Sequence, residues 1–186
     1  MRASTGVLTA LLVSWRARTA RAQTFEHTHG LAVIRIAMEE RTASIDFLSP
    51  AENIFGFEGE PCTPAQREAR ARTIGVVRDS FAQMLSFDRA LGCSIIPVEV
   101  HAGNDSHAHD VQSVGHTHAG TDSTGARHVE VHGDFLLRCA RPFAGSNITV
   151  NMTRWFPSLT TVDVVFVTGD SQRVVRLPGG AGVVVP

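Results

Sequence analysis

Histidines are the residues of this sequence best suited to chemistry. There are nine of them in 186 residues, and most occur as His-x-His pairs, in which two imidazoles stand two positions apart. Neutral imidazole is the commonest protein ligand for transition metals, and Zn²⁺ prefers about four N, S or O ligands in a tetrahedron. The pattern therefore predicts metal binding. The candidate ligands are His27, His29, His101, His107, His109, His116, His118, His128, Glu130 and His132.

One group of candidates shares a predicted strand. In the pattern His128-x-Glu130-x-His132 the three side chains are two positions apart, so a strand places them in a row on one face, with neighbours about 7 Å apart. Further donors must then come from elsewhere. His27 and His29, which enter the first predicted strand, are the natural complement. We expect a preformed site if these two strands are neighbours.

A second group lies in a segment with little to bury. Residues 101–127 consist mainly of His, Gly, Ser, Thr, Asp and Ala, a composition that predicts a flexible loop. Metal binding in such a loop must also offset the ordering entropy of the chain, so weaker sites of variable stoichiometry are expected. We interpret the loop as a collector of metal. The alternative is a low-complexity insertion without function.

Strands are the main elements that must position these ligands. Alternating apolar residues predict a hairpin of residues 31–38 and 42–48. Further strands are predicted at residues 93–100, 128–140, 147–151, 162–167 and 171–176. Pro97 places its strand at an edge or at a bulge, because proline cannot donate a ladder hydrogen bond.

A helix is predicted after the hairpin. Thr63, Pro64 and Gln66 have the pattern of an N-cap, first helical residue and capping-box partner. Apolar residues three and four apart, from Ile74 to Leu85, continue the helix to about residue 87. The predicted fold class is therefore α+β, an antiparallel sheet of about seven strands packed with one main helix and carrying the long His-rich loop.

The N-terminus has the pattern of a secretory signal peptide. Residues 1–22 combine a basic start, an apolar run over residues 6–15 and the sequence Ala20-Arg21-Ala22 as a cleavage site. Export to the periplasm would leave residues 23–186 as a single metal-binding domain. The apolar run is about half as long as a membrane span, so no membrane insertion is expected. The alternative is a buried N-terminal helix.

The charge of the processed chain excludes some partners. Loss of residues 1–22 removes four arginines and no acid, so the 17 basic residues fall to 13 against 18 acidic ones. Nucleic acids and anionic membranes are recognised through clustered positive charge. We therefore expect neither as a partner. An acidic chain is compatible with cation binding.

The three cysteines bear on the compartment. In an oxidising environment two should pair, and Cys93 with Cys139 is the preferred disulfide because both lie in or beside strand-like segments that flank the long insertion. Closing a loop of that length is worth about 3–4 kcal/mol in the chain-entropy model. Cys62 is then left as a free thiol, with a role as a metal ligand as the less favoured alternative.

Several short segments resemble a known family. His27-Thr28-His29-Gly30, Ser49-Pro50-Ala51-Glu52-Asn53 and Gly56-Phe57-Glu58 are similar to the H-x-H-G, S-P-A-x-N and G-F-E stretches of the ZrgA-like family of zinc-uptake proteins from Gram-negative periplasms. The His-rich loop, the strand from His128 that carries Cys139, and the Phe156-Pro157 turn are similar too. Together these segments cover most of residues 27–177.

The resemblance implies an accessory protein that captures zinc and supports a high-affinity zinc importer, and it implies no enzyme activity. Expected partners are the zinc ion and the zinc ABC importer or its solute-binding protein. Two departures stand out. Gly59-Glu60 occupies the place where a His is expected, so that Glu58 or Glu60 would have to substitute, and Cys62 falls outside the family pattern.

Three rival interpretations remain. In a zinc-dependent hydrolase, Glu130 would act as general acid or base between His128 and His132, although the sequence has no H-E-x-x-H or G-x-S-x-G motif. A copper- or nickel-binding periplasmic protein would use the same histidines, since imidazole binds Cu²⁺ more tightly than Zn²⁺. A structural β-rich domain with incidental histidines would show no metal dependence.

Overall fold

The computed structural model describes residues 28–103, 129–143, 145–169 and 171–186. In these ranges the chain forms nine strands, two α-helices and one 3-10 helix. In chain order they are β1 (Leu31–Glu39), β2 (Thr42–Pro50), α1 (Ala51–Phe55), α2 (Pro64–Met84), β3 (Leu85–Phe87), η1 (Arg89–Leu91), β4 (Ser94–Gly103), β5 (Glu130–Arg138), β6 (Ile148–Asn151), β7 (Thr161–Thr168), β8 (Ser171–Pro178) and β9 (Ala181–Val184).

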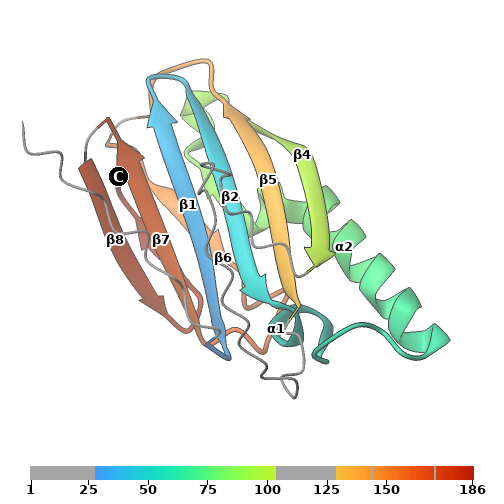
Figure 1. Cartoon of the computed structure of the whole chain (residues 1–186). Coiled ribbons are helices and arrows are strands. Elements are labelled where there is room, and N and C mark those ends of the chain that lie inside the picture. The colour runs from blue at the N-terminus through green and yellow to red at the C-terminus, as the bar shows by residue number, and fades with distance from the viewer. Residues whose placement is uncertain (1–27, 104–128, 144, 170) are drawn as a thin grey trace, which may run out of the picture.

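The strands belong to two sheets. Six form a large sheet in the order β4-β5-β2-β1-β7-β8 (Figure 1), and three form a small sheet in the order β3-β6-β9. All neighbours are antiparallel except β1 and β7, which are parallel. The prediction of about seven strands in an antiparallel sheet is therefore wrong in the number of strands and in the direction of one central pair. The strands β3 and β9 are too short to show an alternation, and a parallel pair depends on a long crossover that local patterns do not reveal.

The predicted main helix is confirmed as α2. Thr63 is its N-cap, and the side chains of Thr63 and Gln66 form the reciprocal capping box, with Pro64 in the first turn. The helix ends at Met84 and does not reach residue 87. Leu85 is fully buried and begins β3, where it pairs with Val150. Leu85 is thus buried as a strand residue of the small sheet and does not continue the helix.

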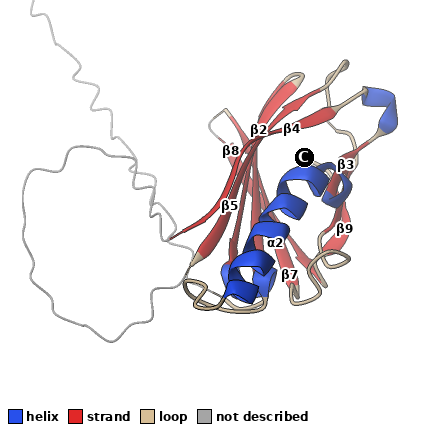
Figure 2. Ribbon diagram, turned by 90° about the vertical axis from the view of Figure 1, so that its right-hand side faces the viewer, coloured by secondary structure: helices blue, strands red, loops and turns tan. Residues whose placement is uncertain are grey.

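The core lies between the large sheet on one side and α2 with the small sheet on the other (Figure 2). Phe81 of α2 stacks on Phe135 of β5 with ring centroids 3.9 Å apart and meets the edge of Phe47 of β2 at 5.8 Å. Val77 and Met84 of α2 are fully buried in the same cluster. One face of the large sheet is therefore committed to the core. The side chains of its opposite face are those available for binding.

Two predictions about β4 are confirmed. Cys93 and Cys139 form a disulfide with an S–S distance of 2.06 Å, which links the start of β4 to the end of β5. The strand β4 is at the edge of the large sheet, and its register shifts between Pro97 and Glu99 at an irregularity of the bulge type. Among the described residues no helix is both long and apolar enough to cross a bilayer.

Candidate metal centre

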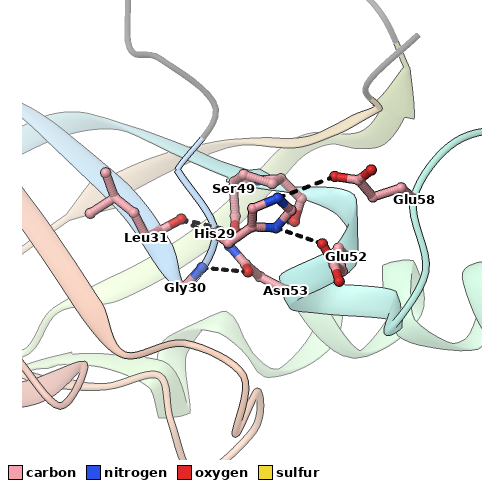
Figure 3. Close-up of polar contacts among 8 residues, drawn as sticks. His29, Gly30, Leu31, Ser49, Glu52, Asn53 and Glu58 are labelled. Atoms are coloured by element: carbon pink, nitrogen blue, oxygen red, sulfur yellow. Dashed lines mark hydrogen bonds and ion pairs between the residues drawn. The ribbon is translucent and has the colours of Figure 1, made fainter. Parts of the chain in front are cut away.

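Three side chains with metal-ligand chemistry meet at one end of the large sheet. His29, Glu52 and Glu58 each place a ligand atom within 4.8 Å of those of the other two. The His29 Nδ1 atom is 2.6 Å from Glu52 Oε2, and His29 Nε2 is 3.7 Å from Glu58 Oε1 (Figure 3). Both nitrogens of one imidazole therefore face a carboxylate. In the described part of the chain this is the one group of three His, Cys, Asp or Glu residues with such spacing.

A tight turn presents His29 at the start of β1. The Leu31 N–H donates to the Thr28 carbonyl at 3.1 Å, and Gly30 has a φ of +78°. A Cβ at this glycine would lie 2.4 Å from Thr160 Oγ1. A glycine is therefore needed at position 30 for two reasons: the backbone is left-handed, and the chain that leads into β7 passes too close for a side chain.

Buried polar side chains lock the same turn. Asn53 accepts a hydrogen bond from the Gly30 N–H at 2.8 Å and donates to the Leu31 carbonyl at 3.1 Å and to Ser49 Oγ at 3.2 Å. Asn53 and Ser49 are buried, so their polar atoms need these partners. The network ties the His29 turn to the end of β2 and to α1. Glu52 immediately precedes Asn53 in α1.

Glu52 belongs to the first turn of α1. The helix is anchored by its first residue, because the Ala51 N–H donates to the Val129 carbonyl at 2.8 Å just before β5. The helix ends at Phe55, and the N–H of the following Gly56 donates to the Glu52 carbonyl at 2.9 Å. This places Glu58 only three residues beyond the helix, on a loop that passes His29 (Figure 3).

A salt bridge fixes the far side of that loop. Arg70 of α2 contacts Glu60 Oε2 at 2.7 Å and also donates to the Ala102 carbonyl at the end of β4. One guanidinium therefore links the loop that carries Glu58 to the last residues of β4. The depression beside His29 has a volume of about 400 Å³, and its lining includes Glu52, Asn53 and Thr160.

Two further histidines form a pair on the neighbouring strands. His101 of β4 lies directly opposite His132 of β5, and their rings stack with centroids 5.3 Å apart and 10° between planes. Their side chains are only 24% and 19% exposed. A carboxylate lies near each ring, at 3.5 Å between Glu130 Oε2 and His132 Nε2 and at 3.6 Å between Glu99 Oε1 and His101 Nδ1.

The face that carries this pair has further charges. Asp46 of β2 pairs in register with Asp134 of β5 and lies 3.7 Å from Arg35 of β1. Burial raises the pKa of the Asp46 carboxyl, with Arg35 acting in the opposite direction and Asp134 adding to the increase. The surroundings of the histidine pair are thus acidic on this side.

The structure divides the candidate ligands that it describes into two groups. Glu130 and His132 do share one face of β5, as the alternation predicted. The condition set for a shared site, that the strand of His29 neighbours theirs, is not met, because β2 lies between β1 and β5. The hairpin partner takes the place beside β1, and β5 pairs with the outer edge of β2. His29 therefore meets Glu52 and Glu58, while His132 meets His101.

Other predicted ligands are not described. His27, His107, His109, His116, His118 and His128 lie outside the described residues. Glu52 was missed by sequence reasoning, although an acid directly after Ser49-Pro50-Ala51, at the start of a short helix, is a position that favours a carboxylate. Glu58 was considered only as a substitute for a missing His, and the structure places it beside His29.

The cluster of one histidine and two carboxylates at this end of the sheet has the side-chain types from which a divalent cation could be held. The chain belongs to the ZrgA family of zinc uptake proteins, whose family model matches residues 26–185. Membership gives it a role related to zinc uptake. No curated protein matches the sequence.

Proposed function

We propose that this protein captures Zn²⁺ in the periplasm as cargo for high-affinity import, with His29 and Glu58 as ligands and Glu52 as the residue that orients His29. The observation that carries the proposal is the 3.7 Å gap between His29 Nε2 and Glu58 Oε1. This gap is too long for a hydrogen bond and close to the separation of about 3.4 Å that two ligands have on a tetrahedral zinc ion.

The role of Glu52 follows from its shorter contact. At 2.6 Å from Nδ1 its carboxylate is placed to accept a hydrogen bond from the Nδ1–H of a neutral imidazole, in which Nε2 carries the lone pair. A metal-bound histidine usually has such a carboxylate or carbonyl on its other nitrogen, and this partner raises its basicity. Glu52 and Glu58 also add negative charge next to the incoming cation.

The remaining histidines extend this role. Neutral imidazoles bind Zn²⁺ above about pH 7, and protonation competes near pH 5–6. In this proposal the His-rich stretch collects zinc, and an importer component such as its solute-binding protein receives it. The proposal includes no catalysis, since a carrier needs several exchangeable sites, whereas a hydrolase needs one tight metal with an open position.

Zinc titration calorimetry at neutral pH tests the site on the full chain from Gln23. Glu58→Gln and Glu60→Gln form a matched pair, because each removes one carboxylate from the same loop, but Glu60 faces Arg70 and Glu58 faces His29. We expect Glu58→Gln and His29→Ala to weaken the tightest site at least tenfold, and Glu60→Gln by less than threefold. Glu52→Gln should fall between them.

Two results would contradict the proposal. One is equal weakening by Glu58→Gln and Glu60→Gln, which would indicate a general charge effect. The other is a wild-type affinity no tighter than about 10 μM, or some −7 kcal/mol. Competition with Cu²⁺ and Ni²⁺ in the same experiment tests the metal, because imidazole sites bind Cu²⁺ more tightly than Zn²⁺ whatever their physiological cargo.

A further inference from the structure

The His101–His132 pair is a feature that the His29 site does not explain. The two residues are directly opposite each other on antiparallel strands, in positions whose Cβ atoms are about 5 Å apart in such ladders. Their rings are nearly parallel, with the centroids 5.3 Å apart. Each side chain is about four-fifths buried. Neither belongs to the cluster of His29, Glu52 and Glu58.

Oxygen donors complete the set around the pair. Glu130 is two residues before His132 on the same face of β5, with its Oε2 3.5 Å from His132 Nε2. Glu99 is two residues before His101 on β4, with its Oε1 3.6 Å from His101 Nδ1. Two imidazoles and two carboxylates on paired strands are the number and the type of ligands that a tetrahedral divalent cation takes.

The strands that carry the pair, β4 and β5, are held in place on both sides of it. The disulfide Cys93–Cys139 joins the two strands at their far end. Near His101, Arg70 donates to the Ala102 carbonyl and so ties the end of β4 to α2. On β2, Leu48 is the register partner of His132 and lies on the same face. The backbone positions that carry the two imidazoles are therefore fixed relative to each other.

No three of these four side chains place their ligand atoms within 4.8 Å of one another in the structure, so coordination requires the side chains to rotate. Two nitrogens on one tetrahedral zinc are about 3.3 Å apart, which parallel rings at 5.3 Å reach by turning toward each other. The terminal torsion of histidine is broad, so this rotation has a low energetic cost.

We propose that His101, His132 and Glu130, with Glu99 as fourth donor, form a second folded site for a borderline divalent transition cation such as Zn²⁺. It goes beyond the proposed function because it uses different side chains, and it stands whether or not zinc binds at His29. With two imidazoles its ligand set is richer in nitrogen than that of the His29 cluster, so it favours imidazole-preferring metals over harder cations such as Mg²⁺.

Imidazole-detected NMR on the full chain from Gln23 tests this site without interference from other histidines. The ¹H–¹⁵N correlations of His29, His101 and His132 are assigned by single substitutions and followed during a Zn²⁺ titration. We expect the signals of His101 and His132 to change together. The same joint change is expected in a His29→Ala background. In His132→Ala the response of His101 should be lost while that of His29 persists.

Control variants keep the test falsifiable. Glu130→Gln should weaken the joint response at least tenfold, whereas Asp134→Asn, two residues further along the same strand, should change it by less than threefold. His101→Asn provides a second variant should His132→Ala unfold, and backbone amide spectra verify the fold. A His101 response that survives His132→Ala, or no response of either ring at a zinc excess that saturates His29, would overturn the proposal. A silent His29 beside a responsive pair would contradict only the His29 site.

Discussion

The two histidine groups differ in how the chain assembles them. His29, Glu52 and Glu58 come from a turn, a short helix and a loop, and the His29 side chain is 67% exposed. His101 and His132 face each other on paired strands and are mostly buried. One group is open and rich in oxygen, and the other is enclosed and rich in nitrogen. The comparison teaches that one end of a sheet can bring together two histidine groups that differ in both exposure and donor type.

The largest expected difference comes from the disulfide. Replacing Cys93 and Cys139 together by Ala should lower the free energy of unfolding by about 3–4 kcal/mol, because their closed loop spans 46 residues. Since the bond joins β4 to β5, it should also weaken cation binding at the His101–His132 pair more than at His29. Urea unfolding and zinc titration measure both. Cys62→Ala, which removes the exposed free thiol, is the control and should change neither. A loss below about 1 kcal/mol would contradict the chain-entropy account.

Acidic pH should weaken zinc binding at the two groups to different extents, because they contain different numbers of imidazoles. Zinc binding must displace protons from one imidazole in the His29 cluster and from two in the pair. As the pH falls, zinc binding at the pair should therefore weaken more steeply than binding at His29, because two imidazoles compete with protons in place of one. Site-resolved NMR titrations between pH 5 and 6 measure the two slopes. Equal slopes would mean that the groups do not differ in this way.

Removal of the buried amide should affect one group only. Asn53→Ala leaves the Gly30 N–H and the Leu31 carbonyl without their partner and should cost about 2 kcal/mol of stability. It should also weaken zinc binding at His29 and leave the histidine pair unchanged. Thermal unfolding and calorimetry provide the two measurements. Ser49→Ala, which disturbs the same network but keeps the bond to Gly30, should have the smaller effect on both.

The smallest effect is expected at Asp46. Because burial raises its carboxyl pKa in the folded protein, the folded state binds its proton more tightly than the unfolded chain does. Stability from this group is thus present at low pH and is lost as pH rises from about 3.8 through the raised pKa. Asp46→Asn should stabilise the protein at pH 7 by less than about 1 kcal/mol, since the group is partly exposed and Arg35 loses its ion pair. Urea midpoints at pH 7 and pH 3 measure it, and a gain at pH 3 as large as at pH 7 would exclude this cause.

Local patterns predicted the local structure well. The hairpin of β1 and β2, the capping box of Thr63, the edge position at Pro97 and the Cys93–Cys139 bond all depend on neighbouring residues or on simple compartment chemistry. The parallel pairing of β1 with β7 depends on a contact between residues more than a hundred positions apart. No periodicity encodes such a contact, and the strand order was therefore missed.

The same distinction applies to the candidate sites. That Glu130 and His132 share a face followed from strand geometry alone. That His101 faces His132 follows only from the register of β4 on β5, and that Glu52 approaches His29 follows from the anchoring of α1 at Val129. A histidine pattern indicates the chemistry of a metal protein, whereas the grouping of its ligands is decided by tertiary pairing.

The ladder between β4 and β5 sets how freely the connection between the two strands can vary in length. Its register runs from Ser94 opposite Arg138 to Gly103 opposite Glu130, and the disulfide fixes it next to the first of these pairs. The residues between Gly103 and Val129 can therefore gain or lose length without moving a strand. Doubling the length of a connection costs only about 0.6 kcal/mol. A change in the number of residues in this connection would therefore leave the register of β4 on β5 the same.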